Sequence, residues 1–131
     1  MSDTSSHAPD VILLAEDEGE VRRFLARLLS GAGYQVLEAA NGALALAAAQ
    51  AHAGVIRLLV TDVVMPVMTG TELARQFLAA RPLARVLFIS GYSDPAAIAE
   101  IQTLAGAEFL GKPFSPRDLL SRVRALLASA V

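Results

Sequence analysis

The sequence predicts an α/β domain built on a doubly wound parallel sheet, and three observations indicate it. Short β-rich apolar runs alternate five times with longer segments of helical periodicity between Asp10 and the C-terminus. The runs VILLA (11–15) and RVLFI (85–89) lack strict alternation of apolar and polar residues, which is typical of strands covered by helices on both faces. The chain has 131 residues, 54% of them hydrophobic, and no Cys, so one domain can bury a core without disulfides.

Five strands and five helices are expected in strict alternation along the chain. The expected strands are Val11–Ala15, Gln35–Glu38, Arg57–Thr61, Arg85–Ile89 and Glu108–Leu110. The expected helices are Glu20–Ser30, Ala43–Ala51, Thr71–Ala80, about Ala96–Leu104 and about Pro116–Ser129. In chain order, Gly31 and Gly33 close the first helix, Asn41-Gly42 opens the second, Asp94-Pro95 caps the fourth and Ser115-Pro116 starts the fifth.

Composition and charge exclude several classes of protein. The formal net charge is -2, and Arg22, Arg23 and Arg27 are interspersed among apolar residues, which argues against a nucleic-acid partner. These arginines are expected on a solvated helix face or at a partner contact. No apolar stretch approaches the ~18 residues of a membrane span and no secretion signal is present, so we expect a cytoplasmic protein. Residues 1–9 are expected to form a flexible N-terminal tail, and residues 10–131 the domain.

Polar side chains follow four of the expected strands at the point where each strand ends. Glu16 and Asp17 follow the first strand, Asp62 the third, Ser90 the fourth and Lys112 the fifth. A single strand-end aspartate is usually a helix cap or a turn residue. Doubly wound sheets, however, bind ligands outside the carboxyl ends of their strands, so together these groups are expected to form the functional site.

The residue types at these strand ends favour a cation and phosphoryl chemistry. Carboxylates ~5 Å apart repel by roughly 3 kcal/mol per pair at an effective dielectric of about 20. Oxygen ligands without Cys favour Mg²⁺, and His7 and His52 each stand alone, which makes them poor candidates for metal binding or a catalytic triad. Asp62 is then the natural nucleophile, forming an acyl phosphate whose oxygens Lys112 and Ser90 would bind.

Four motifs, in order, resemble the receiver domain of two-component response regulators. They are ILLAEDE (12–18), DVVMPVMTG (62–70), SGY (90–92) and FLGKPF (109–114). The resemblance covers about residues 10–131 and implies a flavodoxin-like (βα)5 fold with strand order 2-1-3-4-5. It also implies a phosphoacceptor of two-component or phosphorelay signalling, which switches conformation to control a downstream protein target.

The resemblance also implies roles for individual residues. Asp62 would accept the phosphoryl group from a phosphohistidine, and Mg²⁺ would be held by Glu16, Asp17, Asp62 and the backbone carbonyl of Val64. Lys112 would bridge to the phosphoryl group. The remaining assignments are to switch and structural residues: Ser90 as the switch hydroxyl, Phe109 as the switch aromatic, Gly91 as a small residue beside the phosphoryl group, and Pro113 as the second residue of a cis peptide bond that aims Lys112.

Partners and chain context follow from the same resemblance. The partner would be a histidine kinase or a histidine phosphotransfer protein, with neither nucleic acid nor membrane involved. The chain would be a stand-alone receiver or one excised from a larger protein such as a hybrid histidine kinase. Ile98, Ile101 and Leu104 are expected either in the core or in a dimer seam linked to phosphorylation. No enzymatic activity is expected beyond promotion of its own phosphorylation and dephosphorylation.

The sequence departs from the family pattern at several positions, and two other functions are therefore considered. Glu16 replaces a common Asp, Val64 and Tyr92 occupy positions that tune dephosphorylation, and Phe109 lacks a Tyr hydroxyl. A Mg²⁺-dependent aspartyl phosphatase would need a general acid at position 64, where this chain has Val64. A pseudo-receiver that binds partners without phosphorylation would usually lose an acidic residue or the lysine, and this chain retains all of them.

Overall fold

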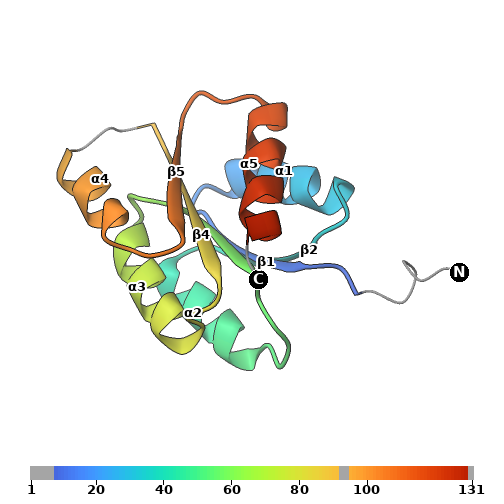
Figure 1. Ribbon diagram of the computed structural model, residues 1–131, viewed down its shortest axis with the longest axis horizontal. Helices are drawn as coiled ribbons and strands as arrows, with labels where there is room; N and C mark the ends of the chain where they lie inside the picture. Colours follow the sequence, from blue (N-terminus) through green and yellow to red (C-terminus); the bar gives the residue numbers. More distant parts are fainter. Residues whose placement is uncertain (1–7, 92–94, 130–131) are drawn as a thin grey trace, which may run out of the picture.

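The computed structural model describes residues 8–91 and 95–129, which form a five-stranded parallel sheet in the order β2-β1-β3-β4-β5 (Figure 1). The strands are β1 (Val11–Ala15), β2 (Gln35–Ala39), β3 (Leu58–Asp62), β4 (Arg85–Ser90) and β5 (Ala107–Gly111). The helices are α1 (Gly19–Gly31), α2 (Gly42–Ala51), α3 (Gly70–Ala80), α4 (Pro95–Gln102) and α5 (Pro116–Ser129). The expected fold class and strand order are therefore confirmed.

Two apolar clusters lie on opposite faces of the sheet. Because successive side chains of a strand point to opposite faces, Leu13 belongs to the cluster under α2 and α3, while Ile12 and Leu14 belong to the cluster under α1 and α5. All five residues of β1 are buried. Ile101 is buried in the first cluster and Leu104 packs against it, so both contribute to the core. The double coverage explains why the strand runs lack strict alternation of apolar and polar residues.

The helices begin and end close to the cap and turn residues expected from the sequence, with small differences. Asn41 caps α2 by accepting a hydrogen bond from Leu44 N at 2.8 Å, and Gly33 supplies the left-handed turn after α1 with φ of 103°. The fourth helix ends at Gln102, two residues before the expected end at Leu104. Thr103 N and Leu104 N instead donate to the carbonyls three residues earlier, those of Glu100 and Ile101, which is the hydrogen-bond pattern of a 3₁₀ turn. The expected Asp94 cap and residues 1–7 of the expected tail lie outside the described residues.

The sheet topology determines where a site can form. Strand order reverses between β1 and β3, which pair side by side in the middle of the sheet. The carboxyl ends of β1, β3, β4 and β5 thus meet at one edge, next to this reversal. Within the described ranges, no helix is both long enough and apolar enough to cross a membrane.

Candidate functional site

The strand-end residues singled out from the sequence meet at the carboxyl edge of the sheet. Glu16 and Asp17 directly follow β1, and Asp62 is the last residue of β3. One carboxylate oxygen from each of the three residues lies within 4.8 Å of the other two. Asp17 is exposed, whereas the Asp62 side chain retains 14% of its accessible surface. The structure therefore brings together the acidic cluster that the sequence predicted.

Glu16 is the most buried member of this cluster, with 1% of its surface exposed. Its Oε2 accepts a hydrogen bond from Glu18 N at 3.1 Å, but its Oε1 is buried and has no hydrogen-bond partner. Burial raises the pKa of Glu16 from 4.5 to about 7; the nearby Asp62 charge adds to the rise, and the Glu18 N–H and Lys112 oppose it. A buried carboxylate oxygen without a donor is costly unless a cation or a proton satisfies it.

The donor set fits a hard divalent cation. Three clustered carboxylates and an unpartnered buried oxygen offer only oxygen ligands, and the chain has no Cys. Mg²⁺ is commonly bound by a few carboxylates and keeps several coordination positions for water and phosphoryl oxygens. Bound there, it would also relieve the mutual repulsion of the three carboxylates.

Lys112 supplies a positive charge next to Asp62. Its Nζ lies 3.7 Å from Asp62 Oδ2, and the Lys112-Pro113 peptide bond is cis, as expected. Lys112 N donates to the Ser90 carbonyl at 2.9 Å, which links the ends of β4 and β5. Asp62 thus lies between an ammonium group and two further carboxylates, an arrangement suited to holding a phosphoryl group.

The expected switch residues lie near this edge. Ser90 ends β4 and is buried, while Phe109 is half-buried in β5, where it pairs in register with Phe88 and packs against the core cluster under α2 and α3. Gly91 is exposed, and a Cβ added there would meet Lys112 Cβ at an ordinary 3.8 Å. Its small size is therefore not required by the protein's own packing. Tyr92 lies outside the described residues.

The loop after Asp62 also packs against the site. Val64 N donates to Asp62 Oδ1 at 3.3 Å, so the Val64 backbone lies against the carboxylate while its side chain is exposed. A Cβ added to Gly70 would lie 1.9 Å from the Asp62 carbonyl oxygen, so only glycine fits at this close approach. From the sequence, Gly70 is expected only to help shape the loop after Asp62; the close approach to the Asp62 carbonyl is visible only in the folded structure.

Arg22 corrects the expectation that the α1 arginines form only a solvated face or a partner contact. Its side chain is 19% exposed, its Nη1 donates to the Glu16 carbonyl oxygen at 2.9 Å, and its Nε lies 3.5 Å from Glu38 Oε1. Arg22 therefore ties α1 to the ends of β1 and β2 beside the acidic cluster. Periodicity could not reveal this, because the same spacing also suits a solvated arginine.

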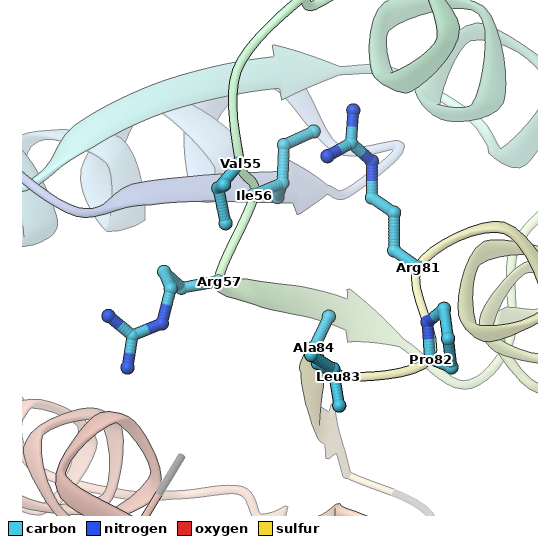
Figure 2. A pocket seen from close by; sticks show the side chains of 7 residues that line it. All are labelled: Val55, Ile56, Arg57, Arg81, Pro82, Leu83 and Ala84. Carbon is cyan, nitrogen blue, oxygen red and sulfur yellow. The ribbon is translucent and has the colours of Figure 1, made fainter. Parts of the chain in front are cut away.

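A pocket at the opposite end of the sheet lacks comparable chemistry (Figure 2). It has a volume of ≈ 440 Å³ and is lined by Val55, Ile56, Arg57, Arg81, Pro82, Leu83 and Ala84. Its lining contains no carboxylate, and the Arg81 guanidinium donates to the carbonyls of Ala49, His52 and Gly54. The candidate site is therefore the carboxyl edge.

A family model and individual relatives both match this chain to the same family of domains. Residues 12–124 match the model of the response regulator receiver domain. The response regulator receiver protein CpdR of Brucella abortus is 40% identical over 119 residues, which covers 91% of this chain and 98% of that protein.

Sensor kinases contain similar domains. The sensor kinase CckA of Brucella abortus is 39% identical over 116 residues, and the match covers 88% of this chain but 12% of that protein. The crystal structure of the receiver domain from the hybrid histidine kinase CckA superimposes with a TM-score of 0.77 at 42% identity, covering 89% of this chain and 98% of that one. Similar domains thus occur both nearly alone and within a longer chain.

Proposed function

The chain belongs to the response regulator receiver domain family, and on that premise we propose that Asp62 is the residue that accepts the phosphoryl group in two-component signalling. The observation that carries the proposal is the position of Asp62 between the Lys112 ammonium, 3.7 Å away, and the carboxylates of Glu16 and Asp17. This surrounding charge suits a group that alternates between carboxylate and acyl phosphate.

The proposed reaction transfers one phosphoryl group between two side chains. A carboxylate oxygen of Asp62 bonds to phosphorus while the P–N bond of a donor phosphohistidine breaks, and the imidazole nitrogen leaves with the electron pair. Such a displacement needs mainly positioning and charge neutralisation. Later attack of water on phosphorus would return the carboxylate and inorganic phosphate. The donor is a histidine kinase or a histidine phosphotransfer protein.

The chain's own residues divide the work of binding and orientation. The Val64 N–H holds Oδ1 of Asp62, and Lys112 faces Oδ2, so the carboxylate is restrained on both sides. Glu16, Asp17, Asp62 and the Val64 carbonyl would hold Mg²⁺, which when bound neutralises charge on the phosphoryl oxygens. Ser90 would donate its hydroxyl to the new phosphoryl group, and Phe109 would move with it as the switch.

The other functions considered are less well supported. An aspartyl phosphatase would need a proton donor two residues after the nucleophile, where Val64 has an apolar side chain. A pseudo-receiver would need no complete site, yet the acidic cluster and Lys112 are both present and adjacent. The chain itself is therefore expected to catalyse only its own phosphorylation and dephosphorylation.

Incubation with acetyl phosphate and Mg²⁺, followed by intact mass measurement, tests the proposal. The wild-type chain should gain one hydroxylamine-sensitive phosphoryl group, which decays after the donor is removed. Asp62→Asn should gain none, nor should the wild type without Mg²⁺. Asp10→Asn, which alters a carboxylate at the opposite end of the sheet, should be phosphorylated normally.

If acetyl phosphate does not phosphorylate the chain, addition of beryllofluoride and Mg²⁺ distinguishes the remaining explanations. A perturbation of the wild-type protein that Asp62→Asn abolishes would mean that the site is intact and accepts phosphoryl groups only from a phosphohistidine protein. No response would favour the pseudo-receiver, and phosphorylation that persists in Asp62→Asn would remove Asp62 as the acceptor.

A further inference from the structure

The loop of residues 63–69 lies against the Asp62 carboxylate, although it belongs to no helix or strand. One bond joins the start of the loop to the last residue of β3, and a second joins the residue after the loop to the loop's own first residue. Val64 N donates to Asp62 Oδ1 at 3.3 Å, and Gly70 N donates to the Val63 carbonyl at 2.8 Å. The middle of the loop, residues 65–69, must be held by other contacts.

The tip of this loop is strained at Val67. Its φ is 76°, and Met68 N donates to the Pro66 carbonyl at 2.8 Å, which together form a γ-turn of the rare positive-φ type. A left-handed conformation is unfavourable for a β-branched residue. The Val67 side chain is 80% exposed, so it gains little buried contact in return. Neighbouring residues must therefore hold the turn.

Met68 provides such a restraint on the far side of the turn. Its side chain packs against the core cluster under α2 and α3. A Cβ added to Gly42 would lie 2.9 Å from Met68 Cβ and 2.9 Å from its Sδ, so Met68 rests on the bare α-carbon at the start of α2. Met65, which unlike the half-buried Met68 is buried, contacts Thr61 of β3 and so stays close to the strand end.

We propose that Met68 is a positioning residue of the site. Its contact with Gly42 holds the strained Val67 turn and thereby keeps the Val64 backbone against Asp62. The inference rests on the proposed function in one respect, namely that the Val64 carbonyl is a Mg²⁺ ligand. The restraint on the loop itself needs no metal, and it can be measured in the metal-free protein.

Met68→Ala tests the restraint, with Leu78→Ala as the matched control. Leu78 is also half-buried and packs against the same core cluster, but it lies on α3. In metal-free protein, Met68→Ala should accelerate hydrogen exchange of the Val64 amide relative to amides of the central strands. By calorimetry, its Mg²⁺ affinity should fall about tenfold, because a strained turn without its anchor occupies the binding-competent conformation less of the time. Leu78→Ala should change neither quantity.

A second substitution separates positioning from simple packing. Glycine adopts positive φ without strain, so the turn in Met68→Ala/Val67→Gly no longer needs an anchor. This double variant should recover most of the Mg²⁺ affinity and return the exchange rate of the Val64 amide toward the wild-type rate. Gly42→Ala should reproduce the Met68→Ala effect by displacing Met68, while Gly31→Ala, where an added Cβ meets nothing within 4 Å, should have no effect on the site.

The outcomes distinguish this inference from the proposed function. Unchanged Val64 exchange and Mg²⁺ affinity in both Met68→Ala and Gly42→Ala would overturn the positioning role and leave the proposed function standing. A double variant no better than Met68→Ala would show that Met68 acts through the core alone. A wild-type chain that binds no Mg²⁺ would refute the metal site of the proposed function, and with it a positioning role toward that site.

Discussion

The two ends of the same sheet differ in whether their charged side chains find hydrogen-bond partners within the chain. At the amino end, Arg81 donates to the main-chain carbonyls of Ala49, His52 and Gly54, at 2.9 to 3.1 Å. At the carboxyl end, Glu16 keeps a buried oxygen without a partner, and two further carboxylates, those of Asp17 and Asp62, lie within 4.8 Å of its carboxylate.

This difference separates residues that stabilise the fold from residues that bind something outside it. The guanidinium of Arg81 is satisfied by the chain itself, so it links the end of α3 to the end of α2 and the segment after it. The Oε1 atom of Glu16, by contrast, has no partner within the described chain and needs a proton or a cation. The comparison predicts that neutralising substitutions at the two ends change stability with opposite sign.

The largest expected effect is at the carboxyl end, with Glu16→Gln. Because the pKa of Glu16 is raised from 4.5 to about 7, the folded state binds this proton more tightly than the unfolded state. Wild-type stability should therefore fall, relative to Glu16→Gln, as pH rises from about 4.5 to about 7. In chelator, the variant should be more stable by about 3 kcal/mol at pH 8 and equal at pH 4, measured by urea unfolding.

Two controls make this result specific. Glu18→Gln removes an exposed neighbouring charge and should show no such pH dependence. Excess Mg²⁺ at pH 8 should stabilise the wild type by about 2.7 kcal/mol at a hundred times its Kd, and Glu16→Gln by much less. A variant that is no more stable than the wild type at pH 8 in chelator would contradict the account of Glu16.

The next effect, of opposite sign, is expected at the amino end. Arg81→Met keeps the aliphatic stem but leaves three carbonyls without their charged donor, so it should destabilise the fold by about 2 kcal/mol at any pH near neutral. Mg²⁺ affinity should be unchanged. Arg75→Met, within α3, removes ion pairs to the partly exposed Glu72 and Glu100 and should cost less than about 1 kcal/mol. Equal losses in the two variants would argue against a special role of the carbonyl bonds.

The smallest effect is expected for the partly exposed ion pair between Asp10 and Arg57. Their charged atoms lie 3.1 Å apart with side chains 38% and 32% exposed, and Arg57 also donates to the Leu127 carbonyl. Asp10→Asn should cost about 0.5 kcal/mol, and the loss should shrink further in high salt. Urea unfolding at low and high salt measures it; a salt-independent loss above about 1 kcal/mol would mean that Asp10 does more than pair with an exposed charge.

Much of this architecture could be predicted because local patterns encode it. Apolar runs such as Val11–Ala15 and cap residues such as Asn41 specified strands and a helix start within a residue or two. The same alternation placed Glu16, Asp62 and Lys112 at strand ends. The third strand begins at Leu58, one residue after the expected start at Arg57, although the Arg57 backbone still bonds to Val11 and Arg85.

The sequence by itself determined the fold class, the strand-end position of the acidic residues and Lys112, and the family to which they belong. Only the tertiary structure decided that Glu16 Oε1 has no partner, that Arg22 binds the Glu16 carbonyl, and that Met68 rests on Gly42. The physical reason is the range of the interactions. Periodicity and caps act over a few residues, whereas a hydrogen-bond partner or a close packing contact depends on which elements the folded sheet brings together.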